Sequence, residues 1–162
     1  MGHVQRRGKP VRRVRVLASR TLGLGLALTA ACAQPPPFKP VTTVKELMKS
    51  TIEPTSEAVF DAAVWENGVP VGAPKSDDEW NEVRYSALTL AESGNLLMMA
   101  PRARDELGWM TRSLALVDAG VGAAKAAESR NLDAVFRAGG QIYLACTGCH
   151  QQYMSNVQQG PQ

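Results

Sequence analysis

The chain has 162 residues, with 18 Lys and Arg against 15 Asp and Glu, which gives a formal net charge of +3. Seven of the cations and none of the acids lie in residues 1–31, so the rest of the chain carries 11 cations and 15 anions, a net charge of −4 (11 − 15). Because the positive excess belongs to the N-terminal segment alone, it does not indicate nucleic-acid binding. A hydrophobic fraction of 44% and a charged fraction of 20% exclude an intrinsically disordered chain.

Residues 1–31 have the pattern of a secretory signal peptide. A cationic stretch over residues 1–20 precedes an apolar stretch of 11 residues, Thr21–Ala31. A transmembrane helix needs about 20 apolar residues, whereas the apolar part of a signal peptide is about this short. We therefore expect export to the periplasm.

Two processing routes fit the residues that follow. Cys32 comes after small residues, as in a bacterial lipobox, although Thr29 stands where that box usually has Leu. On this route Cys32 is the lipidated first residue of the mature chain and a lipid anchor holds the protein at the membrane. On the other route the Ala-Cys-Ala sequence around Cys32 is the cleavage site and the cysteine is removed. Residues 32–42 are predicted to form a proline-rich spacer in either case.

Residues 43–154 are predicted to form an all-α domain, an antiparallel up-down-up-down four-helix bundle. The first helix begins at a capping box that opens with Thr43, and Pro54 interrupts it. The second begins at a similar box at Ser76, the third near Asp105 and the fourth after Asn131. No segment alternates with period two, so no sheet is expected, and residues 155–162 are predicted to be a flexible tail.

Apolar residues at three- and four-residue steps predict the buried face of each helix. For the third helix these residues are Leu107, Met110, Leu114, Val117, Val121 and Ala124. For the fourth they are Leu132, Val135, Phe136, Gly139, Ile142, Tyr143, Cys146, Cys149, His150 and Tyr153.

Residues 146–150 read Cys-Thr-Gly-Cys-His, the C-x-x-C-H pattern of covalent haem c attachment. On a helix, Cys146 and Cys149 share one face, so that two thiols can add to two vinyl groups along one edge of a porphyrin. His150 lies four residues after Cys146 on the same face and can place a ring nitrogen on the iron. Gly148 lets a flat macrocycle approach the backbone.

Three other uses of the cysteines fit the sequence less well. A thioredoxin-like pair begins a helix after a strand, whereas this pair comes late in a helix. A structural zinc site needs four ligands, and few other candidates remain after loss of the leader. A disulfide between positions i and i+3 of a regular helix has poor geometry.

With this motif near the end of a four-helix pattern, the chain resembles the class II c-type cytochromes, cytochrome c′ and its low-spin relatives. The resemblance covers residues 43–153, and its specific part is residues 141–153. It implies one haem c attached through Cys146 and Cys149, with His150 as the proximal iron ligand. Met154 stands where cytochrome c′ usually has Arg or Lys, which is a departure from the family pattern.

The resemblance implies that the sixth iron ligand, if there is one, comes from the start of the first helix. Met48 and His150 each lie about four residues from the same end of the bundle, roughly 6 Å along it. Met48 is therefore the predicted distal ligand, and the alternative is that it is a core methionine packed on the haem. The other predicted pocket residues at this end of the bundle are Met98, Met99, Trp109 and Met110.

The expected function is that of a periplasmic one-electron carrier rather than an enzyme. The net charge of −4 predicts a redox protein partner with a basic docking patch, and no nucleic acid. A five-coordinate haem that binds NO or CO is the alternative, in which Met48 only covers the distal face. Bundles of this family often pair through their first two helices, so a homodimer is also compatible with the resemblance.

Overall fold

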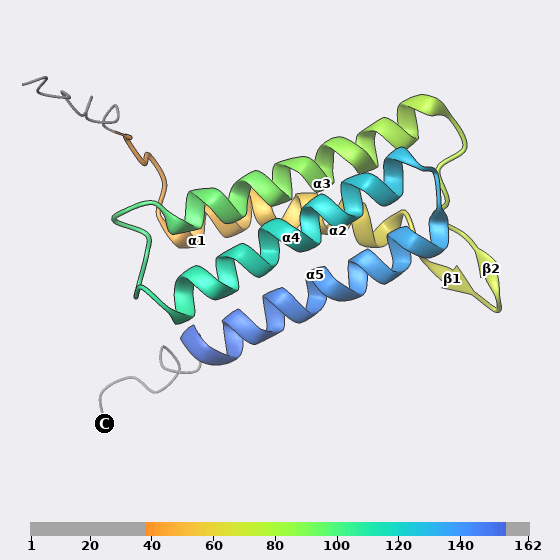
Figure 1. Cartoon of the computed structure of the whole chain (residues 1–162). Helices are drawn as coiled ribbons and strands as arrows, with labels where there is room; N and C mark the ends of the chain where they lie inside the picture. Colours follow the sequence, from red (N-terminus) through yellow and green to blue (C-terminus); the bar gives the residue numbers. More distant parts are fainter. Residues whose placement is uncertain (1–37, 155–162) are drawn as a thin grey trace, which may run out of the picture. The chain divides into compact units, whose positions relative to one another are not determined.

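The computed structural model describes residues 38–154. The predicted signal peptide, Cys32 and the predicted tail over residues 155–162 lie outside this range. The described part is mainly helical, with the elements in the order α1 (Val44–Leu47), η1 (Met48–Ile52), α2 (Glu53–Asp61), β1 (Trp65–Glu66), β2 (Val69–Pro70), α3 (Asp77–Met98), α4 (Gly108–Glu128) and α5 (Leu132–Tyr153) (Figure 1). None of the described helices is both long and apolar enough to cross a membrane.

The predicted first helix is a continuous run of α1, η1 and α2. The predicted capping box is confirmed, because the Thr43 hydroxyl accepts from the Glu46 N–H at 3.2 Å and the Glu46 carboxylate accepts from the Thr43 N–H at 2.8 Å. η1 is a turn of π-helix, in which the Glu53 N–H donates to the Met48 carbonyl. Pro54 follows directly, at the second position of α2, where its missing N–H is tolerated. The interruption predicted at this proline therefore takes the form of a π-helical turn just before it.

A short hairpin of β1 and β2 follows α2, although no strand was expected. Trp65 pairs with Pro70 and Glu66 pairs with Val69 in an antiparallel register. Asn67 and Gly68 form the turn with φ values of 52° and 78°, which are the left-handed conformations that a two-residue hairpin requires. Strands of two residues are too short to produce an alternating pattern, so the signal for this hairpin is the Asn-Gly pair alone.

α3 and α4 pack closely through small residues. A Cβ added at Gly120 would lie 2.8 Å from the Ala91 nitrogen and 2.9 Å from the Ala87 carbonyl oxygen. A Cβ at Gly94 would lie 2.6 Å from the Val117 side chain. The two helices run antiparallel, since Gly94 faces the first half of α4 and Ala87 faces the second.

The predicted inner face of the third helix was wrong for Leu107, Leu114 and Val121, whereas Met110 and Val117 are half-buried and Ala124 is buried. Leu107 is 82% exposed, and Leu114 and Val121 are also exposed. The buried residues of α4 are Trp109, Ser113, Leu116, Ala119, Gly120, Ala123, Ala124, Ala126 and Ala127. Close contact with α3 selects alanine and glycine over much of the buried face, and Trp109 and Leu116 are the large side chains that α4 buries.

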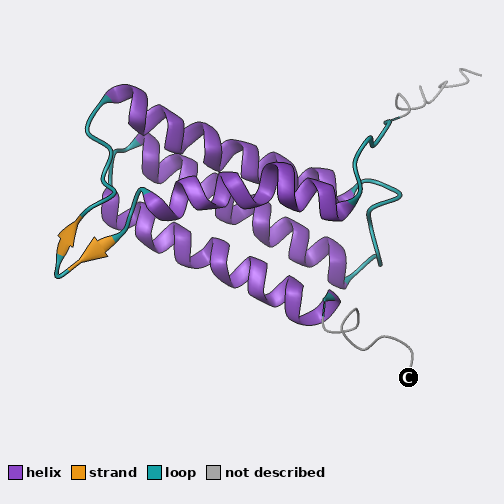
Figure 2. Ribbon diagram, turned by 180° about the vertical axis from the view of Figure 1, so that it is seen from behind, coloured by secondary structure: helices purple, strands orange, loops and turns teal. Residues whose placement is uncertain are grey.

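α5 packs on α4 along its length, and together with α2 and α3 these helices enclose the core (Figure 2). Leu90, Ile142, Val59 and Val135 are the largest fully buried apolar side chains, and they come from α3, α5 and α2. α2 lies mainly against α3 and more loosely against α5. The start of α1, the end of α3, the start of α4 and the end of α5 therefore meet at one end of the bundle, and the hairpin lies at the other end (Figures 1 and 2).

Candidate functional site

The residues of the C-x-x-C-H motif lie in the last turns of α5. The helix begins at Asn131, whose side chain accepts from the Ala134 N–H at 2.9 Å. Cys146 and Cys149 are free thiols and are half-buried, while His150 is exposed. The helical spacing therefore places two thiols on the inner edge of α5 and the imidazole beside them, at the surface.

A small cavity of about 20 Å³ lies between this part of α5 and the rest of the bundle. Met48, at the start of η1, is half-buried and lines the cavity together with Cys146, Cys149 and His150. The other lining residues are Ile52, Leu97, Arg112, Ser113, Leu116 and Ala145. The structure thus brings Met48, which is about 100 residues away in the chain, to the same cavity as the motif.

Arg112 of α4 lies directly on the glycine of the motif. A Cβ added at Gly148 would lie 2.6 Å from an Arg112 guanidinium nitrogen. The same guanidinium donates to the Gln152 side chain at 3.4 Å. Gly148 therefore gives room to a cation from the neighbouring helix, and sequence reasoning missed Arg112 because a single exposed arginine has no periodic signal.

Burial and charge set the protonation of the two thiols. Burial raises the pKa of Cys146 above its ordinary value. The pKa of Cys149 is also raised, chiefly by burial and secondarily by the neighbouring Cys146, and the charge of Arg112 opposes these effects. The thiols are therefore mainly protonated at neutral pH, and Arg112 favours the thiolate of Cys149 over what burial alone would allow.

A hydrogen-bonded clamp joins the end of α5 to the start of α4. The Tyr153 hydroxyl donates to Asp105 at 2.5 Å. The other oxygen of the Asp105 carboxylate accepts from the backbone N–H groups of Gly108 at 2.6 Å and Trp109 at 3.1 Å. The Tyr153 ring meets the Trp109 ring edge-on, with centroids 5.0 Å apart. These contacts fix the turn of α5 that carries His150, three residues before Tyr153.

Arg102 joins the chain before α1 to the end of α3 and is a buried residue that sequence reasoning missed. Its guanidinium donates to the Thr42 carbonyl at 3.1 Å, to the Thr42 hydroxyl at 2.9 Å and to the Leu96 carbonyl at 3.1 Å. Hydrogen bonds to charged groups are among the stronger ones in proteins. Arg102 therefore anchors the start of the helix that carries Met48.

The four other predicted pocket residues lie at this end of the bundle but are not among those that line the cavity. Trp109 is buried, and its ring N–H donates to the Leu97 carbonyl at 2.7 Å. Met98 ends α3, Met99 follows it in an extended conformation and Met110 lies in the first turn of α4, all of them half-buried. Their role as pocket residues stays a prediction.

The donor groups of the motif are of the kind that attach haem c. Within residues 38–154, no group of three or more His, Cys, Asp or Glu side chains is arranged to hold a metal ion. Two free thiols spaced one turn apart, followed by an imidazole, suit attachment to the edge of a macrocycle and to its iron.

Comparisons of the chain with models of known protein families, with curated proteins and with solved structures find no match.

Proposed function

We propose that the protein is a monohaem c-type cytochrome that carries single electrons. The observation that supports this best is the grouping of Cys146, Cys149, His150 and Met48 around one cavity. Two thiols of an attachment motif therefore lie near an imidazole and a thioether, which are groups that bind haem iron.

Each residue has a distinct role in this proposal. Cys146 and Cys149 would hold the porphyrin through thioether bonds, and His150 and Met48 would bind the iron. When bound, the haem supplies the Fe(III)/Fe(II) couple. Leu97, Ile52 and Leu116 exclude water from the iron, and a methionine ligand favours the ferrous state.

Binding of a haem in this cavity would require η1, which forms one of its walls, to move away from α5. Pockets for organic ligands have volumes of about 300–1,000 Å³, whereas the present cavity has about 20 Å³. η1 packs on α3 rather than closely on α5, so it can separate from α5 without disturbing the contact between α3 and α4. A π-helical turn at this position is consistent with such a site, since these turns occur often at functional sites.

The chain's location and partners follow from the same proposal. Covalent haem c attachment takes place after export, so the signal-like residues 1–31 and the proposed cofactor both favour the periplasm. Cys32 would either anchor the protein as a lipoprotein or be removed with the leader. The net charge of −4 after residue 31 favours a redox partner with a basic docking patch.

The spectrum of the reduced protein with and without CO tests the function. An electron carrier with His and Met ligands should give sharp α and β bands that CO leaves unchanged. A high-spin ferrous spectrum that shifts with CO would replace the proposal with the NO- and CO-binding alternative, in which Met48 covers the distal face without binding the iron.

Replacing Met48 tests the distal ligand itself. Met48→Ala should convert low-spin iron to high-spin iron, because the thioether is lost and no other side chain replaces it. Met110→Ala is the matched control, since Met110 is also half-buried at this end of the bundle but does not line the cavity. Optical and electron paramagnetic resonance spectra provide the measurement. An unchanged spectrum for Met48→Ala with a changed one for Met110→Ala would make Met110 the ligand.

A further inference from the structure

A second and much larger concavity lies between α2, β1 and the first half of α5. Its volume is about 830 Å³. Its lining is mainly apolar, and we call it the aromatic groove after the four rings that line it, Phe60, Trp65, Phe136 and Tyr143. The size falls within the range of pockets for organic molecules, about 300–1,000 Å³. None of its residues lines the cavity beside the C-x-x-C-H motif.

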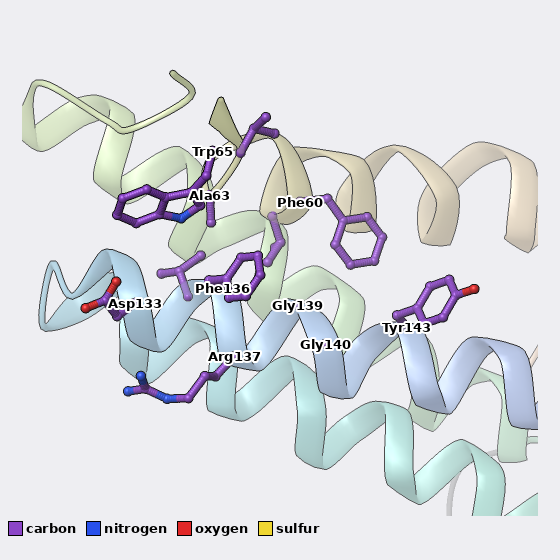
Figure 3. Close-up of a pocket in the computed structure, with 12 residues that line it drawn as sticks. Phe60, Ala63, Trp65, Asp133, Phe136, Arg137, Gly139, Gly140 and Tyr143 are labelled. Carbon is purple, nitrogen blue, oxygen red and sulfur yellow. The ribbon is translucent and has the colours of Figure 1, made fainter. Parts of the chain in front are cut away.

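Aromatic side chains project into the groove from both walls. Phe60 points from α2 toward α5, and Phe136 extends from α5 toward α2 (Figure 3). Tyr143 lies on the α5 side with its ring directed along that helix, and Trp65 lies at the end near Asp133. Phe136 is 59% exposed and Tyr143 is 61% exposed, so the prediction that both belong to the buried face of this helix was wrong. Single exposed rings are common on protein surfaces, but these two line one concavity together with Phe60 and Trp65, and grouped apolar surface of this kind is typical of ligand or partner sites.

The floor of the groove is bare backbone at two consecutive glycines of α5. A Cβ added at Gly139 would lie 3.3 Å from the Phe60 ring, so this glycine makes room for Phe60. A Cβ added at Gly140 would meet nothing within 4 Å, and Gly140 leaves open space between Phe136 and Tyr143. The result is a flat surface bordered by rings, which suits a flat molecule better than a bulky one.

The charges at the groove favour an uncharged occupant. Asp133 and Arg137 are its only charged lining residues, and their charges cancel. Arg137 points away from the space between α2 and α5 (Figure 3). An ionic ligand would lose its hydration without gaining an ion pair inside the groove.

We propose that the aromatic groove binds a neutral, planar aromatic small molecule, which contacts the side chains of Phe60, Phe136 and Tyr143. Ring contacts on both walls favour such a molecule over an acyl chain, because aromatic pairs gain from edge and stacking contacts beyond the area they bury. The proposal does not rest on haem attachment, because the groove is formed by other residues.

Equilibrium dialysis of the full mature protein against 2-naphthol tests the proposal. Saturable binding of one molecule per chain is expected. Naphthalene-2-sulfonate, which has the same rings with a negative charge, should bind more weakly. Gly140→Leu should weaken 2-naphthol binding by at least about tenfold, the effect of roughly 1.4 kcal/mol. Its side chain fills the groove, while its Cβ fits the fold.

Gly122→Leu is the matched control. Gly122 is also an exposed helical glycine with nothing within 4 Å of an added Cβ, but it lies on α4 outside the groove. Phe136→Ala gives a second test that adds no bulk, and it should also weaken binding. Circular dichroism and melting temperature verify that each variant is folded.

Three results would overturn the proposal. The first is an absence of saturable 2-naphthol binding. The second is binding that Gly140→Leu and Phe136→Ala leave unchanged, which would place the ligand elsewhere. The third is a dimer, seen by analytical ultracentrifugation, that Gly140→Leu dissociates and 2-naphthol does not, which would make a second copy of the chain the occupant.

Discussion

The pair formed by Asp105 and Tyr153 links the protonation of two single side chains to the stability of the proposed haem site. Hydrogen bonds from the Tyr153 hydroxyl and from the backbone of Trp109, in that order, lower the pKa of Asp105 below its ordinary value. Burial and then the hydrogen bond to Asp105 raise the pKa of Tyr153 from 10.0 to about 12. Both shifts favour the state in which the phenol is protonated and the carboxylate is charged.

These shifts predict how the melting temperature depends on pH. The folded-state pKa of Asp105 is lowered, so its contribution is fully present above its ordinary pKa and is lost as the pH falls through the lowered value. Asp105→Asn should therefore lower the melting temperature by a few degrees at pH 7 and by less at pH 3. Asp118→Asn, which removes an exposed carboxylate from α4, is the control. An equal loss at both pH values would mean that the charge of Asp105 is not what stabilises the clamp.

The same reasoning applies in the alkaline range, with the opposite sign. The folded-state pKa of Tyr153 is raised, so its contribution is present below pH 10 and is lost as the pH rises through about 12. The clamp is therefore intact throughout the neutral range.

Arg112 should tune the reduction potential of the proposed haem. A cation beside the motif disfavours Fe(III), so Arg112→Gln should lower the potential by an amount on the order of tens of millivolts. Arg84→Gln is the matched control, because it makes the same change in net charge at the opposite end of the bundle, where Arg84 lies 3.8 Å from Glu128. Spectroelectrochemical titration provides the measurement. Equal shifts for the two variants would mean that only net charge matters.

At the scale of residues, the sequence indicates side chains that belong to a motif or to a helix start. It does not indicate side chains whose importance comes from contacts with other elements. The spacing of residues 146–150 and the position of Met48 at the start of a capped helix were enough to predict a common site. Arg112 and Arg102 could not be predicted, because nothing in the sequence distinguishes an arginine that contacts another helix, or one that is buried, from an arginine exposed to solvent. Only the packing of α4 on α5, and of the chain before α1 on α3, assigns their contacts.

At the scale of elements, helix starts were predicted better than helix faces. The side chains of Thr43, Ser76 and Asn131 each accept a hydrogen bond from a backbone N–H of the helix they begin, as predicted. The third helix was expected to start near Asp105 but starts at Gly108, with the Asp105 carboxylate as its cap. Its buried face was only partly predicted because large apolar residues dominate the periodic pattern, whereas α4 buries mainly alanines beside Trp109 and Leu116.

Gly120 and Gly122 test the close contact between α3 and α4. An alanine at Gly120 would meet backbone atoms of α3, which cannot move aside, so Gly120→Ala should destabilise the protein by about 1–3 kcal/mol. Gly122→Ala has open space and should stabilise it by roughly 0.5–1 kcal/mol through helix propensity alone. Urea denaturation of both variants measures the difference. Similar gains in both would mean that α3 and α4 are not in close contact at Gly120.

At the scale of the whole molecule, the bundle separates a tightly packed part from a looser one. α3, α4 and α5 pack closely, while α1, η1 and α2 cover α3 more than α5. The cavity with the motif and the aromatic groove both lie along this looser side, at its two ends.

Covalent pigment is the most direct test of the central claim. The protein should be purified from a bacterial host that has the c-type maturation machinery, and its intact mass and its behaviour in acidified acetone measured together. The expected mass is that of the processed chain plus one haem, and the colour should remain on the precipitated protein. The double variant Cys146→Ser, Cys149→Ser should lose both the added mass and the colour. A correctly processed wild-type chain that is colourless, or that releases its pigment into the solvent, would contradict the central claim.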